Sequence, residues 1–249
     1  MHSIKSNSRH VLLALCLISS AHADLVLETE TAERGKKGSF LFSQAIQVDR
    51  EKDGGSTIAT VNQFEFGLSD RAELLIEPFF YEWNNPKVGK SFQGVGDLEI
   101  TPSYMVMIDD EKSWLPSALL AFKLKVPTAT NRDIGTGEFD YQPYIILGKN
   151  FGSWICNFNL GYDFVTSSKD EKLKDQIISD FSVEYKFTPK FSMFAEIFAN
   201  SSPAKGENGT FAGAIATEYR FTEHFSSYLS VGYDSDSLLS IRPGFNIEF

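Results

Sequence analysis

Apolar and polar residues alternate one by one over most of the chain after residue 38. In the stretch WICNFNLGYDF, residues 154–164, every second residue is apolar and most of those between are polar. The stretch DFSVEYKF, residues 180–187, has the same pattern. A period of two residues is typical of β-strands, because successive side chains point to opposite faces. The pattern therefore predicts an all-β chain.

The alternation predicts twelve strands joined by two kinds of connection. The predicted strands are residues 39–50, 56–68, 72–83, 95–108, 114–126, 138–149, 153–165, 177–187, 191–200, 210–221, 225–233 and 238–249. Every second connection is short, such as SDR at 69–71, and most of the others are longer and polar, such as NNPKVGKSFQG at 84–94. This asymmetry is typical of outer-membrane barrels. We predict a single antiparallel transmembrane β-barrel of about 12 strands over residues 39–249 in the bacterial outer membrane, with 14 strands as the open alternative.

The C-terminus supports this orientation. Phe245, Ile247 and Phe249 share the apolar parity of the last predicted strand. We expect them to face lipid and to form the C-terminal signal that the barrel-insertion machinery reads. Counting back from Phe249 puts every short turn on the terminus side, which we assign to the periplasm.

The charged residues of the stretch LLAFKLKVP test the predicted faces. Lys123 and Lys125 lie on the polar parity, and each would cost roughly 2–4 kcal/mol on the lipid face near the midplane. We therefore expect both in the lumen. If the preceding turn is centred on Glu111, Asp97 faces Lys125 and Glu99 faces Lys123, which predicts two cross-strand ion pairs.

Other charged residues lie on the same inward parity. With the four above, we expect these to line the lumen: Glu65, Glu73, Glu77, Asp140, Asp163, Asp180, Glu184, Glu196, Glu218, Arg220 and Arg242. They form either a polar, mostly acidic passage or a paired network that fills a narrow lumen. A twelve-stranded barrel lies between the filled eight-stranded barrels and the open porins, so both interpretations stay open.

Two other residue classes refine the expected wall. Aromatic residues cluster at the short turns and at the opposite strand ends, which predicts two interfacial girdles. The periplasmic girdle is Trp114, Trp154, Phe187, Phe191, Phe221, Phe225 and Phe249, and the outer one is Phe80, Trp83, Phe164, Phe211 and Tyr233. Pro78, Pro102, Pro116 and Pro143 fall inside predicted strands, where we expect bulges or ends of pairing.

The N-terminus predicts export. Lys5 and Arg9 precede an apolar core at 11–18, and Ala21-His22-Ala23 fits a cleavage site. We predict a signal peptide over 1–23 and an N-terminal periplasmic segment over 24–38, which either crosses the barrel mouth or pairs with it. Removal of the signal peptide leaves 21 basic against 33 acidic residues, a net charge of −12. This acidity disfavours nucleic acid as a partner.

The sequence offers few residues that could carry out catalysis or bind a cofactor. The mature chain would keep one histidine, His224, in a predicted turn, and one cysteine, Cys156. A Ser-His-Asp hydrolase needs a placed histidine, and a structural zinc site needs clustered His and Cys. We therefore expect no enzyme activity, no catalytic residues, no metal and no cofactor.

Several stretches together resemble a known family. They include FGLSDRAELLIEP, GVGDLEI, KLKVPTATNRDIGTGEFDY and the closing RPGFNIEF. They are similar to the outer-membrane family named for the meta-pathway of phenol degradation, over about residues 28–249. The resemblance implies an outer-membrane barrel for passage of small hydrophobic or aromatic compounds, and it supplies no catalytic residues.

The main hypothesis is a passive outer-membrane channel for small solutes, hydrophobic or aromatic ones among them, with the lipid bilayer as its surroundings. The alternative is a structural or adhesive barrel with a blocked lumen that acts through its extracellular loops. A lipid-modifying enzyme and a secreted soluble β-protein are two further candidates; the lack of a placed histidine disfavours the first.

Overall fold

The computed structural model describes residues 27–249, except residues 53, 79, 111–112 and 167–172. The predicted signal peptide and cleavage site therefore lie outside the described residues. The described part of the chain forms these strands: β1 (Phe40–Arg50), β2 (Ser56–Gly67), β3 (Ala72–Glu77), β4 (Tyr81–Asn85), β5 (Phe92–Val95), β6 (Leu98–Met107), β7 (Ser117–Val126), β8 (Asp140–Phe151), β9 (Trp154–Asp163), β10 (Gln176–Thr188), β11 (Phe191–Asn200), β12 (Thr210–Arg220), β13 (Phe225–Asp234) and β14 (Leu239–Glu248).

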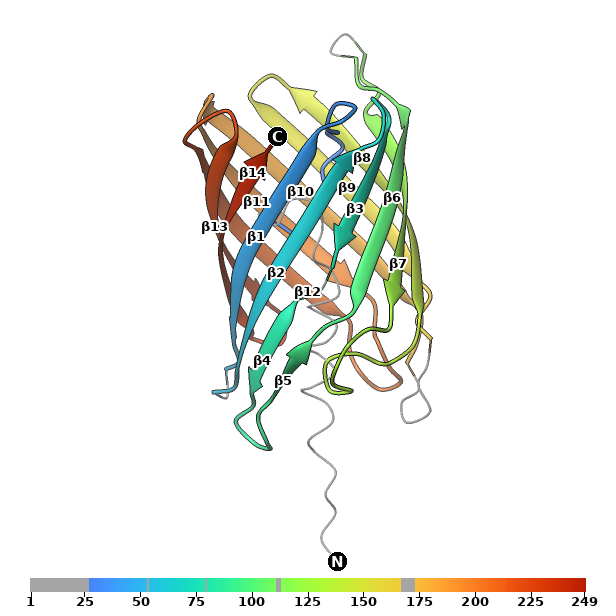
Figure 1. Ribbon diagram of the computed structural model, residues 1–249, viewed down its shortest axis with the longest axis vertical. Coiled ribbons are helices and arrows are strands. Elements are labelled where there is room, and N and C mark those ends of the chain that lie inside the picture. Colours follow the sequence, from blue (N-terminus) through green and yellow to red (C-terminus); the bar gives the residue numbers. More distant parts are fainter. Residues whose placement is uncertain (1–26, 53, 79, 111–112, 167–172) are drawn as a thin grey trace, which may run out of the picture.

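The strands form one antiparallel sheet that closes on itself. β1 pairs with both β14 and β2, which closes the barrel, while β5 pairs with β4 alone. Two wall strands are each interrupted once. β3 and β4 both pair with β2, while β6 pairs with β3 and β5 pairs with β4. β3 and β4 together form one strand of the wall, and β5 and β6 together form the next. The barrel therefore has twelve strands, which confirms the predicted fold class (Figure 1).

The connections at the two ends of the barrel differ as the sequence predicts. The connections at 68–71, 108–116, 152–153, 189–190 and 221–224 lie at the same end as the C-terminus, and all but 108–116, which is longer than predicted, are short. The connections at 86–91, 127–139 and 201–209 lie at the other end, where the β4–β5 hairpin projects furthest in Figure 1. Short turns mark the periplasmic end of outer-membrane barrels, so the C-terminal end is periplasmic.

The two faces of the wall differ in polarity. Large apolar side chains point outward and are exposed in the isolated chain, such as Leu120 at 51% and Ile215 at 63%. Inward positions are largely polar and buried, such as Gln63 and Thr101. A soluble β-protein would bury its apolar face instead, because apolar burial drives folding in water. The outward apolar face is therefore suited to lipid.

The aromatic side chains gather near the turns. At the periplasmic end, Trp114 is 85% exposed, and Phe187 packs against Phe191 with ring centroids 5.7 Å apart. At the other end Trp83 and Phe211 are each 57% exposed. Phe80 differs from its predicted girdle role, because its ring lies against Gly96 at the interruption of the wall.

The four prolines that fall inside predicted strands lie where pairing ends or is interrupted. β3 ends at Glu77, directly before Pro78, and β4 starts at Tyr81, so pairing ends there as expected. Pro116 precedes β7 and lies in a turn. Pro102 and Pro143 pair on one side only, opposite Leu74 and Phe122. On the other side the β6–β7 pairing is interrupted at Pro102 and the β8–β9 pairing starts only after Pro143, so pairing is lost there as expected.

No helix in the described residues is both long enough and apolar enough to cross a membrane.

Candidate functional site

A stretch of chain without regular secondary structure lies inside the barrel. Residues 27–34, which we call the N-terminal strap, precede β1 and pass within the wall of strands. Leu27, Glu28, Thr29 and Glu30 are all at least nine-tenths buried. We expected residues 24–38 either to cross the periplasmic mouth or to pair with the barrel; residues 27–34 instead lie in the lumen and form no strand. No pattern in the sequence signals this, because the strap neither alternates nor pairs as a strand.

Polar side chains from several strands hold the strap. Glu196 on β11 accepts hydrogen bonds from the backbone N–H and the hydroxyl of Thr29, the latter at 2.6 Å. Arg242 on β14 pairs with Glu28 and donates to Gln47 at 2.8 Å. These contacts anchor the first residues of the strap to β11 and β14.

The rest of the strap contacts the other side of the barrel. The Tyr144 hydroxyl on β8 donates to Glu30 at 2.5 Å, and the Asn157 side chain on β9 accepts from the Ala32 N–H at 3.1 Å. Arg34 lies 3.6 Å from Glu73 on β3. The strap is thus held mainly by side chains on five strands rather than by a ladder of backbone hydrogen bonds.

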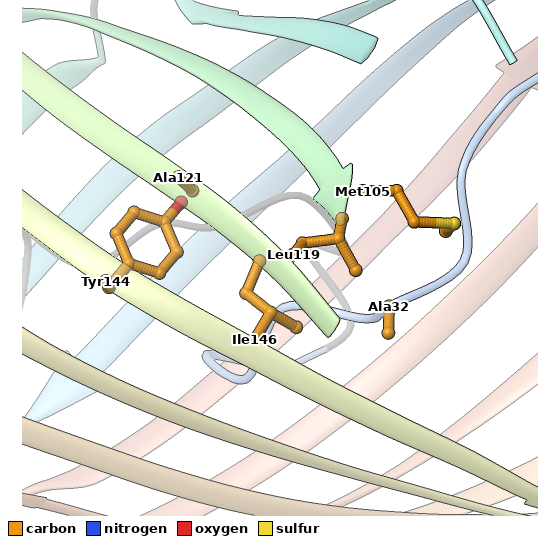
Figure 2. Close-up of a cluster of buried hydrophobic side chains, with 6 residues drawn as sticks. All are labelled: Ala32, Met105, Leu119, Ala121, Tyr144 and Ile146. Carbon is orange, nitrogen blue, oxygen red and sulfur yellow. The ribbon is translucent and has the colours of Figure 1, made fainter. Parts of the chain in front are cut away.

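Two buried apolar clusters of the described interior contact the strap, one around Leu27 and one around Ala32. Ala32 packs with inward side chains of β6, β7 and β8, namely Met105, Leu119, Ala121, Tyr144 and Ile146 (Figure 2). Leu119 and Ile146 are fully buried. Gly148 leaves room for this contact, since a Cβ there would lie 2.3 Å from the Ala32 Cβ.

A second cluster is built around Lys123 on β7. Its ammonium lies 2.7 Å from Glu99 on β6 and 3.6 Å from Glu77 on β3. Glu77 and Glu99 are directly opposite each other across the β3–β6 pair, and like charges in that position repel. Lys123 relieves this repulsion, and all three side chains are nearly inaccessible to solvent.

The predicted register of β6 and β7 is wrong by two residues. Glu99 lies opposite Lys125, not opposite Lys123. The pair of Met107 with Ala118 centres the turn between residues 112 and 113 rather than on Glu111, and the irregularity between Met105 and Met107 offsets only one residue of that difference. The pair of Glu99 with Lys123 forms nevertheless, as a diagonal contact within reach of long side chains.

The partners of the other two residues also differ from the prediction. Lys125 pairs with Asp140, which lies directly opposite it on β8. Asp97 lies between β5 and β6 and accepts a hydrogen bond from the Ala129 N–H at 2.8 Å. Asp97, which the sequence predicts as the partner of Lys125, therefore binds the loop 127–139 instead.

The remaining predicted lumen residues lie at different depths. Asp180 is buried on β10, while Glu65, Asp163, Glu184 and Glu218 are partly exposed. Glu184 accepts a hydrogen bond from Ser192 at 2.6 Å. Arg220 is exposed at the periplasmic rim, 3.9 Å from Glu248.

Two cavities lie in the lumen on different sides of the strap. The periplasmic cavity has a volume of about 410 Å³ and includes Thr31, Glu184, Lys186 and Glu218 in its lining. The extracellular pocket has a volume of about 50 Å³, and Leu27 and Glu28 of the strap form part of its lining. The strap therefore borders both spaces.

Sequence reasoning missed several residues of this interior. Glu28, Glu30 and Arg34 were assigned to a segment outside the barrel, while Asp49 and Asp234 sit at strand ends next to predicted loops. Parity does place Asp49 and Asp234 inward, so the pattern contained that signal. Among the described residues, no cluster of three or more His, Cys, Asp or Glu side chains could hold a metal ion.

The family and the fold have known counterparts. A family model described as "Putative MetA-pathway of phenol degradation" matches residues 40–237, and the chain belongs to that family. The matched range starts at β1 and does not include the strap. A search of curated protein sequences found no match.

Three solved structures share the fold at low sequence identity. The chain is similar to the KdgM porin, with a TM-score of 0.56, 14% identity, and coverage of 83% of this chain and 99% of that one. A "CymD monoaromatic hydrocarbon channel" gives 0.53 at 6% identity, covering 86% and 89%. The translocator domain of the autotransporter NalP from Neisseria meningitidis gives 0.55 at 9% identity, covering 100% of both chains.

Proposed function

We propose that this member of the family is a passive outer-membrane channel for small solutes, whose route follows the polar interior of the barrel. The single observation that carries the proposal is the arrangement of the strap. It separates two cavities and is held by side chains, so it can be displaced without breaking the wall. We further propose that the predicted lumen residues line this route.

The chemistry of the interior bears on which solutes pass. Buried acidic residues, such as Glu82 and Asp180, outnumber the buried basic residues. An acidic, low-dielectric passage disfavours anions and favours neutral or cationic solutes. The family description and the name of the CymD channel support small aromatic compounds as one class within the neutral solutes.

The blocked barrel is the second candidate, and the strap itself favours it. Its residues fill the lumen between the two cavities, with Leu27, Glu28 and Glu30 deeply buried. In that case the protein would act through its extracellular loops rather than by conduction. For either function, we propose that Phe245, Ile247 and Phe249 on the outward face near the closing β1–β14 seam direct insertion of the barrel.

A solute-uptake panel in liposomes distinguishes the two candidates. The mature chain is reconstituted and challenged with phenol, a small ammonium ion and a small carboxylate of similar size. A channel is expected to admit phenol and the ammonium ion faster than the carboxylate, compared with protein-free liposomes. Heat-modifiable gel migration confirms that the inserted chain is folded. If folded protein with and without the strap admits none of the three solutes, the channel proposal fails and the blocked barrel stands.

A further inference from the structure

The extracellular pocket has an unusual balance of charge. Its lining includes the carboxylates of Glu28, Asp49, Glu196 and Asp234 and a single basic side chain, that of Arg242. Arg242 is engaged by Glu28 and Gln47. The other three carboxylates therefore share one pocket without a cationic side chain of their own in its lining.

These carboxylates also have unused hydrogen-bonding capacity. Asp49, Glu196 and Asp234 are 4%, 4% and 6% exposed. One carboxylate oxygen of each has no hydrogen-bond partner among the residues that the structure describes. Leaving a buried acceptor unsatisfied costs about 1–3 kcal/mol, and more for a charged group. Three such oxygens in one pocket indicate a ligand that donates hydrogen bonds and carries positive charge.

The strand register explains why Asp49 and Asp234 lie near each other at one end of the lumen. Asp49 on β1 lies opposite Ser240 on β14, and Ser240 lies opposite Gly232 on β13. Asp234 follows two residues later on β13 and so faces inward at the same end. Gly232 has no side chain, which keeps the space between Asp49 and Asp234 open.

The rest of the lining narrows the class of ligand. Leu27, Phe198, Ala212, Ala214 and Leu238 add an apolar wall, which a bare metal ion would not use. The described residues also offer no set of three metal-ligating side chains. The volume of about 50 Å³ is well below the roughly 150 Å³ of a cavity that holds benzene. The pocket therefore suits a short alkyl chain rather than an aromatic ring.

We propose that the extracellular pocket is a binding site for small primary alkylammonium ions. The ammonium group donates N–H bonds to the unpartnered oxygens of Asp49 and Asp234, and Glu196 adds a third negative charge to the lining. The alkyl chain lies against Phe198 and Leu238. The assignment rests on the proposed channel function in one respect, since it takes the ligand to be a solute that enters from outside.

Ligand-observed NMR titration of the mature, detergent-purified protein tests the site without requiring transport. The probes are propylammonium, its neutral analogue 1-propanol and the anion propionate. Charge-assisted hydrogen bonds contribute about 1.5–3 kcal/mol, so propylammonium is expected to bind about 10- to 100-fold more tightly than 1-propanol. The double variant Asp49→Asn/Asp234→Asn should lose that preference. Glu218→Gln, in the periplasmic cavity, is the matched control and should keep it.

The outcomes separate this site from the channel proposal. Equal binding of propylammonium and 1-propanol, or unchanged preference in the folded double variant, overturns the site. The single variant Asp234→Asn replaces the double variant if the latter fails to show heat-modifiable migration. If binding is absent while liposome uptake proceeds, only the site fails. If binding persists while no solute is taken up, the channel fails and the site stands.

Discussion

The periplasmic end of the lumen and the strap-filled middle are built from the same alternating strands but form different environments. In the periplasmic cavity, Lys186 is 43% exposed, and it lies 3.9 Å from Glu33 and 4.0 Å from Glu184. In the middle, Lys123 is 3% exposed and lies 2.7 Å from Glu99. Water can screen the first set of charges, whereas the second set depends on its partners.

The strap creates this difference. Where it passes, its own Glu28, Glu30 and Arg34 fill the space that water would otherwise take and give the wall charges fixed partners. Where the strap ends, the lumen contains the periplasmic cavity, which has a volume of about 410 Å³. Parity along a strand decides which way a side chain points, but the strap decides whether an inward charge is solvated.

Deletion of residues 27–34 should have the largest effect on the difference between the middle and the periplasmic end of the lumen. Without the strap, the middle of the lumen should become as wet as the periplasmic end, and uptake of phenol into liposomes should rise several-fold. The measurement is the initial uptake rate at equal amounts of folded, inserted protein. An unchanged rate would mean that the strap does not limit passage.

The variant Lys123→Met should destabilise the middle of the barrel strongly. It leaves Glu77 and Glu99 buried without their cation, and breaking a buried pair in this way costs about 3–5 kcal/mol. The free energy of unfolding is measured by denaturant titration in detergent. The matched control, Lys186→Met at the exposed end, should cost no more than about 1 kcal/mol. Equal losses for the two variants would remove the distinction between the two regions.

The variant Leu119→Ala should have a somewhat smaller effect that is specific to the strap. Leu119 is fully buried in the cluster around Ala32, and such truncations cost about 2–5 kcal/mol. The strap should also become easier to displace, which protease sensitivity of residues 27–34 would show. The neighbouring Leu120→Ala, on the lipid face, should leave that sensitivity unchanged.

The smallest effect is expected at the periplasmic rim. The hydrogen bond from Lys149 lowers the pKa of the Asp109 carboxyl in the turn after β6. Because the pKa in the folded state lies below that in the unfolded state, the contact stabilises the fold above the ordinary carboxyl range and is lost as pH falls through the lowered pKa. Asp109→Asn should remove this pH dependence, worth at most about 1 kcal/mol in unfolding titrations. A pH dependence that persists in the variant would place its origin elsewhere.

The wall was predictable from the sequence because its two faces meet different solvents. Alternation placed Lys123 and Lys125 in the lumen, since an ammonium on the lipid face is costly. It also placed the short turns and the C-terminus at one end. The register between β6 and β7 was not predictable to the residue, because neither the centre of the connecting turn nor the irregularity between Met105 and Met107 leaves a pattern in the sequence.

The filling of the lumen was not predictable in the same way. The strap has no period, and its position depends on distant residues such as Glu196 and Asn157, which parity places inward but does not pair. Long-range contacts of single side chains leave no local pattern in the sequence. Gly148 is an example. Glycine is a poor strand former, and only the contact with Ala32 of the strap explains why it occupies this position.

A reversible lock on the strap tests the account most directly. Cysteines replace Ala32 on the strap and Asn157 on β9, which share a 3.1 Å hydrogen bond, and Cys156→Ser removes the free cysteine of the described chain. The account predicts that a disulfide forms, that the oxidised protein in a planar bilayer passes little current, and that a reducing agent raises the current. Failure of the disulfide to form in folded protein, or equal current before and after reduction, would contradict it.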